Sequence, residues 1–284
     1  MKIPEALQPL IDDGIIDDVI RPLKSGKEAT VYLVRSGPHL RCAKVYRNAT
    51  QRSFQKRARY QEGRKVRGSR QARAMTNASR FGRSEQEAAW KNAEVTALHQ
   101  LVAAGVRVPQ PFGYFEGVLI MELVTDAAGQ PAPRLGDISI DADVAREYHA
   151  FLIRQIVRML SVGLIHGDLS EFNVLVGADG PVIIDLPQAV NAAGNNNAFV
   201  MLERDVDNMR SSFGRSAPEL LETEYAREIW ALYEAGELTP DSALSGRFAR
   251  DTSAPDVAAV LTQIEDERRE AEERQLRRHE LDAA

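Results

Sequence analysis

The sequence has a single cysteine, Cys42, among its 284 residues. One cysteine excludes an internal disulfide and a metal cluster built from cysteines, and it is typical of a protein that works in a reducing compartment. No apolar run approaches the roughly 18 residues that a membrane-spanning helix needs. Residues 1–14 place acids and prolines where a signal peptide would carry its apolar segment. We therefore expect a cytoplasmic protein with no membrane partner.

The charge of the chain is distributed unevenly. The net charge is -5, but residues 47–83 carry twelve Lys or Arg and one acid, so this segment has a charge of +11 and the remainder -16. The segment shows no hydrophobic period and is predicted to be a flexible basic insertion. Clustered arginines neutralise phosphates and favour RNA or a ribosomal particle as a partner. A solvated loop that is simply rich in arginine explains the same composition.

The first part of the chain shows a β pattern. With 44% hydrophobic and 27% charged residues, the length fits one large domain or two tightly joined lobes. After a helical extension over residues 1–18, β-favouring runs alternate with turns, and a helix from about Glu85 ends at Gly105. We predict an N-terminal lobe over residues 19–124, made of an antiparallel sheet and this one main helix. Its strands are expected at 19–23, 31–34, 42–46, 112–115 and 118–123.

The pattern becomes helical after residue 124. Residues 126–136 (DAAGQPAPRLG) are typical of a linker, and apolar side chains recur at helical spacing from Tyr148 to Leu160. Short strands are expected at 175–176 and 182–184, and further helices at 216–236 and 255–280, the last with a solvated charged face. Residues 125–284 are therefore predicted to form a mainly helical C-terminal lobe, which makes the fold α+β.

One polar turn carries the residues of a metal-phosphate site. Residues 166–175 (HGDLSEFNVL) follow an apolar helix and lead into a strand, with Asp168 and Asn173 five positions apart. Asp185 ends the next predicted strand. Mg²⁺ takes hard oxygen ligands and keeps several waters, so Asn173 and Asp185 suffice beside phosphates. Asp168 is then free to accept the proton of an attacking hydroxyl.

The complementary half of such a site lies upstream. Lys44 stands inside an apolar strand, where an ammonium needs a partner, and Glu94 on the predicted helix supplies one. Ser25, Gly26 and Lys27 occupy the turn between the first two strands, where a phosphate-covering loop belongs.

Each of these motifs is weak by itself. An HGD triplet is a common polar turn, a strand lysine usually faces solvent, and Ser-Gly-Lys-Glu matches neither the Walker pattern nor G-x-G-x-x-G. The specific signal is their order along the chain, which is the order of a protein kinase.

These motifs resemble the RIO kinases, atypical protein kinases with a kinase fold trimmed relative to ordinary kinases. Residues 25–32 (SGKEATVY) look like their phosphate loop, residues 166–175 like their catalytic loop, and residues 183–190 (IIDLPQAV) like their metal loop. The match runs from about Val19 to Asn208. It is closest to the first RIO subfamily, in a short form of bacterial type, because the 18 residues before Val19 cannot hold the winged-helix domain of the second subfamily.

The resemblance implies a role for each matching residue. Lys44 would bind the phosphates of ATP, and the backbones of Glu122 and Val124 would contact adenine. Asp168 would accept the proton of the acceptor.

The same resemblance implies that Asn173 and Asp185 would hold Mg²⁺, with Mn²⁺ as an alternative. In this family the metal-loop aspartate can itself receive the phosphoryl group, which makes Asp185 a candidate aspartyl-phosphate and the protein partly an ATPase.

The sequence also departs from ordinary kinases, and three functions stay open. Asp185-Leu186-Pro187 replaces D-F-G, and Ala217-Pro218-Glu219 is expected to start a helix rather than to anchor a peptide. The first function is a serine/threonine protein kinase that phosphorylates a protein or at least itself. The second is an ATP-gated switch that binds RNA or a ribosomal particle through residues 47–83. The third is a small-molecule phosphotransferase, which the loop at 25–32 and the basic insertion disfavour.

Overall fold

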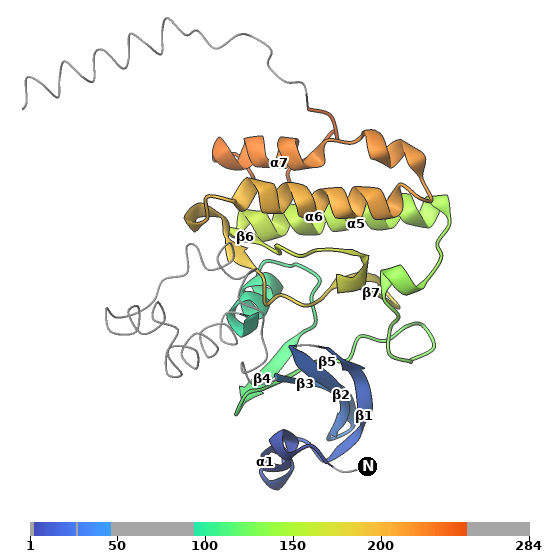
Figure 1. Cartoon of the computed structure of the whole chain (residues 1–284), viewed down its shortest axis with the longest axis vertical. Helices are drawn as coiled ribbons and strands as arrows, with labels where there is room; N and C mark the ends of the chain where they lie inside the picture. Colours follow the sequence, from blue (N-terminus) through green and yellow to red (C-terminus); the bar gives the residue numbers. More distant parts are fainter. Residues whose placement is uncertain (1–2, 27, 47–93, 249–284) are drawn as a thin grey trace, which may run out of the picture. The chain divides into compact units, whose positions relative to one another are not determined.

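The computed structural model describes residues 3–26, 28–46 and 94–248. Several expectations therefore fall outside the described residues: those for Lys27, the basic insertion at 47–83, the helix start near Glu85 and the charged helix at 255–280. Residues up to Phe248 form one compact unit, in which an antiparallel sheet is followed by a mainly helical part (Figure 1). This is the two-lobed α+β kinase fold that the sequence predicts.

The sheet has five antiparallel strands in the order β1-β2-β3-β5-β4. Tight turns join the neighbours: Gly37 has a φ of 59° between β2 and β3, and Glu116 and Gly117 have φ values of 45° and 89° between β4 and β5. These are the turns that the sequence predicts. The strands are β1 (Asp18–Ser25), β2 (Ala29–Ser36), β3 (His39–Tyr46), β4 (Pro111–Phe115) and β5 (Val118–Glu122).

The two faces of this sheet have different partners. One face, which includes Ala43 and Ile120, packs against Leu7 and Leu10 of the N-terminal turn and of helix α1 (Gln8–Asp12). The other face, with Ala29 and Tyr46, belongs to the main core. Because side chains alternate along a strand, Ala43 lies on the first face and its neighbour Lys44 on the second. The sheet therefore presents Lys44 to the rest of the unit rather than to solvent.

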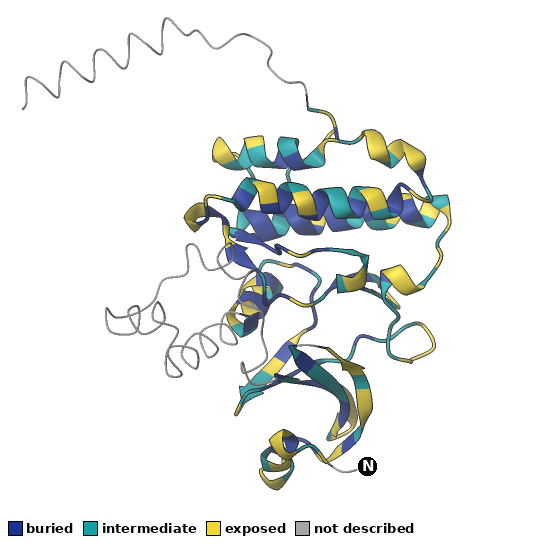
Figure 2. Cartoon of the chain, viewed as in Figure 1, coloured by how far each residue is buried: buried dark blue, intermediate teal, exposed yellow. Residues whose placement is uncertain are grey.

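Two long helices form the centre of the helical part. They are α5 (Ala142–Ser161) and α6 (Ala198–Phe213), which pack against each other (Figure 1), and buried residues run along both (Figure 2). Asp141 caps α5 by accepting a bond of 2.9 Å from the Val144 amide. The expected helix at 216–236 is a 3₁₀ turn, η7 (Pro218–Glu222), followed by α7 (Tyr225–Glu234). As expected, Pro218 opens that turn.

Short strand pairs lie between these helices and place the polar loops. Strand β6 (Leu164–Ile165) pairs with β9 (Val190–Asn191), and β7 (Val174–Gly177) pairs with β8 (Gly180–Ile183). The segment from His166 to Asn173 therefore connects β6 to β7, and Asp185 lies between β8 and β9. Among the described residues, none of the helices is both long and apolar enough to cross a membrane.

Candidate active site

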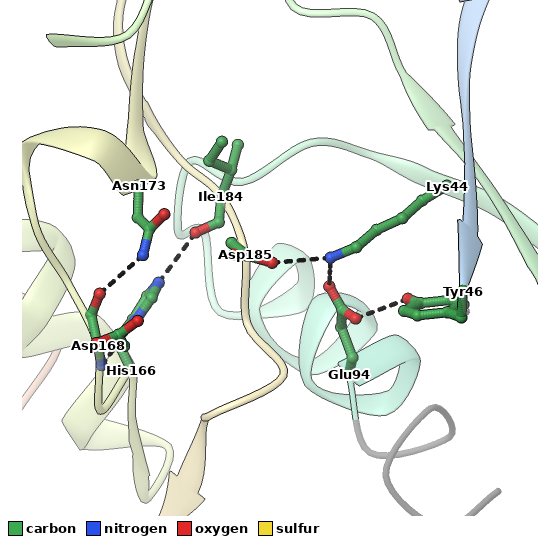
Figure 3. Close-up of polar contacts among 8 residues, drawn as sticks. All are labelled: Lys44, Tyr46, Glu94, His166, Asp168, Asn173, Ile184 and Asp185. Carbon is green, nitrogen blue, oxygen red and sulfur yellow. Dashed lines mark hydrogen bonds and ion pairs between the residues drawn. The ribbon is translucent and has the colours of Figure 1, made fainter. Parts of the chain in front are cut away.

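Lys44 lies at the centre of a cluster of charges, of which Lys44 and Glu94 are buried and Asp185 is partly exposed. Its Nζ donates a hydrogen bond of 2.6 Å to Glu94 Oε1 and one of 2.9 Å to Asp185 Oδ1 (Figure 3). Lys44 is 8% exposed and Glu94 is 2% exposed. Tyr46, two residues along β3, donates a bond of 2.6 Å from its hydroxyl to Glu94 Oε2. Residues 44, 94 and 185, far apart in the sequence, are thus joined directly.

The pKa values of this cluster favour its charged forms. Burial alone would lower the pKa of Lys44, but the charges of Glu94 and Asp185 and their hydrogen bonds raise it above its usual value. Burial alone would raise the pKa of Asp185, and the neighbouring Lys44 ammonium reverses this and holds it below its usual value. Lys44 is therefore a cation, and Asp185 an anion, at neutral pH.

The loop that carries Asp168 is hydrogen-bonded to the segment that follows β8 and carries Asp185. His166 Nε2 donates a hydrogen bond of 3.0 Å to the Ile184 carbonyl, because its Nδ1 accepts one of 3.3 Å from the Asp168 amide. Asn173 Nδ2 donates a hydrogen bond of 2.8 Å to the Asp168 carbonyl, and the Ile184 amide donates one of 2.9 Å to the Asn173 carbonyl. These bonds place Asp168, Asn173 and Asp185 around Ile184 (Figure 3).

The oxygens of this loop fit a divalent cation of the Mg²⁺ type. The Asn173 amide nitrogen is engaged by Asp168, so its Oδ1 points away from that contact. The Asp185 side chain is 48% exposed, and its Oδ1 faces Lys44, which leaves Oδ2 available to a cation. One carboxylate and one amide oxygen match an ion that completes its shell with water and phosphate oxygens. Among the described residues, no group of three His, Cys, Asp or Glu could enclose a metal ion by itself.

Helix α6 holds the loop that carries Asp168 through residues that the sequence motifs did not include. The Asp205 carboxylate accepts bonds from the Gly167 amide at 2.7 Å and the Leu169 amide at 3.0 Å. Asn208 Nδ2 donates a hydrogen bond of 2.7 Å to the Leu169 carbonyl, and the Arg204 guanidinium donates one to the Gly167 carbonyl. Asp205 lies among the buried residues of α6. This position on an apolar helix face could have indicated its role, but the helix itself was not predicted from the sequence. Burial raises the pKa of Asp205 to about 6, although His166 and these amides oppose the shift.

The residues proposed to contact adenine lie where the sheet meets the helical part. Glu122 ends β5, and its side chain forms a two-pronged ion pair with Arg107, at 2.7 and 2.8 Å. The Arg107 amide donates a hydrogen bond of 2.8 Å to the side-chain oxygen of Gln155 on α5, and the Arg107 carbonyl accepts one of 3.0 Å from the Ile183 amide. Val124 is 5% exposed. Arg107 therefore joins the end of β5 to α5 and to the strand that precedes Asp185, a connection that no motif indicated.

The turn proposed to cover phosphate lies at the Lys44 end of the sheet. In the strand register, Ala29 is opposite Tyr46 and Thr30 is opposite Val45. The Gly26 amide donates 2.9 Å to the Ala29 carbonyl, and the Ser25 hydroxyl lies 3.4 Å from that of Thr30. The described part of the turn is thus a tight hairpin connection adjacent to Lys44.

Comparison with known proteins identifies the family. A family profile described as the RIO domain matches residues 30–226 of the chain. The chain belongs to the RIO domain family. The RIO-type serine/threonine-protein kinase Rio1 of Haloferax volcanii is 33% identical over 223 residues, which cover 75% of this chain and 69% of that protein. The serine/threonine-protein kinase RIO1 of Chaetomium thermophilum is 27% identical over 226 residues, covering 75% of this chain and only 42% of that longer protein. These relatives confirm the likeness to the first RIO subfamily.

A solved structure agrees with this membership. The crystal structure of the Rio2 kinase-ADP/Mg²⁺-phosphoaspartate complex from Chaetomium thermophilum superimposes with a TM-score of 0.52 at 25% identity, covering 74% of this chain and 59% of that one. The kinase fold expected for this RIO family member is therefore confirmed. Nucleotide and Mg²⁺ are general features of such kinases.

Proposed function

We propose that this RIO family member is an ATP-dependent serine/threonine protein kinase that phosphorylates a protein, at least itself. The observation that carries the proposal is the contact of Lys44 with both Glu94 and Asp185. It joins a cation suited to phosphates to the carboxylate suited to a metal, inside a fold shared with Rio kinases.

Each end of ATP has a proposed partner. Adenine is held by the backbones of Glu122 and Val124, and the α- and β-phosphates by Lys44, with Ser25, Gly26 and Lys27 over them. Asn173 and Asp185 hold Mg²⁺ or Mn²⁺, which neutralises the charge that develops on the phosphates. Support comes from the orientation of Asn173, whose amide nitrogen is engaged by Asp168 and whose oxygen points away.

Phosphoryl transfer then needs one proton acceptor. The oxygen of an acceptor hydroxyl forms a bond to the γ-phosphorus while the bond from that phosphorus to the β-γ bridging oxygen breaks, and ADP leaves. The hydroxyl proton passes to Asp168. Asp205 and His166 hold the backbone of that residue and its neighbours, so Asp168 approaches the acceptor in a fixed orientation.

A second outcome of the same site is ATP hydrolysis through Asp185. In this route Oδ2 attacks the γ-phosphorus in place of holding the metal, the bond from that phosphorus to the β-γ bridging oxygen breaks, ADP leaves, and water later releases phosphate from the acyl phosphate. The phosphoaspartate in the related Rio2 complex supports this route.

Mass spectrometry after incubation of the intact chain with Mg²⁺-ATP tests both routes. We expect phosphate on serine or threonine, absent in Asp168→Asn, and a hydroxylamine-sensitive phosphate on Asp185, absent in Asp185→Asn. Asp143→Asn, with a side chain that is 95% exposed at the start of α5, is the matched control and should behave as wild type. Wild-type protein that neither carries phosphate nor consumes ATP would refute the proposal.

A second candidate is an ATP-gated switch that holds RNA or a ribosomal particle. The +11 charge of residues 47–83 favours it, since clustered Arg and Lys neutralise backbone phosphates. Deletion of residues 50–82 should weaken RNA binding and its dependence on salt. Unchanged binding after the deletion contradicts this role. The cytoplasmic location and the lobe boundary after Val124 stay predictions.

A further inference from the structure

Glu94 is held by two residues of one strand rather than by one. Lys44 and Tyr46 are two positions apart on β3, so both side chains lie on the face of the sheet that belongs to the main core. Lys44 Nζ donates a hydrogen bond to Glu94 Oε1, and the Tyr46 hydroxyl donates one to Glu94 Oε2, each of 2.6 Å (Figure 3). Glu94 is 2% exposed, so water does not easily replace either partner.

The hydrogen bond from Tyr46 prevents a rotation of the Glu94 carboxylate that the bond from Lys44 alone would allow. A carboxylate bonded through one oxygen can rotate about the bond to its carboxyl carbon and exchange its oxygens, whereas one bonded through both oxygens is fixed. Without Tyr46, Oε2 of Glu94 would be a buried charged oxygen that has lost a donor, which favours a different position of this side chain.

The position of Glu94 matters because Lys44 has two carboxylates to choose from. Its Nζ lies 2.6 Å from Glu94 and 2.9 Å from Asp185. An ammonium that shifts toward Asp185 follows the more exposed carboxylate, whereas one anchored to the buried Glu94 stays against the sheet. Anchoring on Glu94 therefore keeps the Lys44 ammonium in a fixed position relative to the sheet.

Tyr46 is itself held firmly. It is 6% exposed, and its ring packs edge-on against Tyr114 with centroids 6.4 Å apart and planes at 65°. Burial and the charge of Glu94 raise the pKa of Tyr46 above its usual value, so the hydroxyl remains a donor at neutral pH. Lys44 Nζ lies 5.5 Å from the centre of the same ring, within the range of a cation–π contact.

From this geometry we propose that Tyr46 is a positioning residue of the phosphoryl-transfer site: its hydroxyl fixes Glu94 so that Glu94 fixes Lys44. The inference rests on the proposed function, in which Lys44 binds the phosphates. It assigns Tyr46 a role in turnover, acting through Glu94 and without contact to ATP.

The test is steady-state ATP consumption by full-length Tyr46→Phe at varied Mg²⁺-ATP. We expect kcat to fall by about tenfold, the factor that corresponds to about 1.4 kcal/mol of lost transition-state stabilisation, while KM for ATP changes by less than about threefold. The matched control is Tyr32→Phe, because Tyr32 packs on the opposite face of the sheet. It should keep both constants. Circular dichroism at the assay temperature checks that both variants are folded.

A double-mutant cycle with Glu94→Ala distinguishes positioning from packing. If Tyr46 acts through Glu94, Tyr46→Phe should have no further effect on kcat once Glu94 is alanine. Should Glu94→Ala not fold, the split between kcat and KM in the single variant decides. Wild-type kcat in Tyr46→Phe, an equal loss in Tyr32→Phe, or additive losses in the cycle overturn the inference. Wild-type protein that neither consumes ATP nor carries phosphate would instead refute the proposed function.

Discussion

Asp205 offers a sharp test of how helix α6 (Ala198–Phe213) supports the catalytic loop. In Asp205→Ala, the amides of Gly167 and Leu169 lose their acceptor. Each buried amide left without a partner costs about 1–3 kcal/mol, so the loss is about 2–6 kcal/mol. An opposing effect comes from the carboxylate itself, because burial raises its pKa from 3.8 to about 6. Removing this buried carboxylate therefore increases the free energy of unfolding by about 3 kcal/mol at neutral pH, against the loss from the two amides.

The two effects largely cancel in stability but not in activity. We expect the free energy of unfolding of Asp205→Ala, measured with urea, to change by less than about 3 kcal/mol. Turnover of ATP should fall by about a hundredfold or more, because a misplacement of about 1 Å at Asp168 is enough for that. Asp207→Ala is the matched control on the same helix: its carboxylate is 44% exposed and pairs with Arg210 at 3.0 Å, and its removal should leave turnover intact.

The pH dependence of Asp205 has a definite sign. Its folded pKa lies above the unfolded value, so the folded state binds more protons between pH 3.8 and about 6. The contribution of this group to stability is therefore present at low pH and is lost as the pH rises through that window, by up to about 3 kcal/mol. Asp205→Asn cannot titrate and should lack this slope. Wild-type turnover in Asp205→Ala, or equal slopes for wild type and Asp205→Asn, would refute the reasoning.

Three further outcomes are expected. Mg²⁺-ATP should raise the melting temperature of the wild type by mass action, and Lys44→Met should reduce the shift; a wild-type curve that does not move contradicts ATP binding. Burial lowers the pKa of His149 from 6.5 to about 4, so its contribution to stability is lost as the pH falls through that window. The free energy of unfolding of wild type should drop by about 2 kcal/mol more than that of His149→Phe between pH 7 and pH 5. A cycle of Arg107→Met and Glu122→Gln, measured with urea, should give a coupling of about 1 kcal/mol, since both side chains are partly exposed; additive effects would contradict the pairing.

Sequence reasoning succeeded where a local rule applies to neighbouring residues. The turn at Gly37, the helix end at Gly105 with its φ of 71° and the hairpin over Glu116 follow from backbone preferences of a few residues. The pairing of Lys44 with Glu94 was predicted because a lysine buried in a strand must have a carboxylate partner. The order of the motifs along the chain then predicted the kinase fold.

The rest could not be predicted because it depends on which segments meet. Arg107 and Glu122 pair across the end of the sheet, and nothing in their local sequence distinguishes them from solvated charges. Helix α6 was missed because Arg204, Asp205 and Asn208 interrupt its apolar pattern, and these residues turn inward to bind loop backbone. Polar residues that serve another segment look, in sequence, like exposed ones.

The backbone of Asp185 limits which residue can replace it. Its φ of 68° lies in the left-handed region, which glycine, asparagine and aspartate tolerate and which costs most other residues about 1–2 kcal/mol. An alanine at this position would combine a change of chemistry with a change of loop shape, and its inactivity would not identify the cause. An asparagine keeps the backbone and removes only the charge. The backbone at this position therefore favours asparagine or glycine among the uncharged replacements. A relative that has lost catalysis through this residue is expected to carry one of these two.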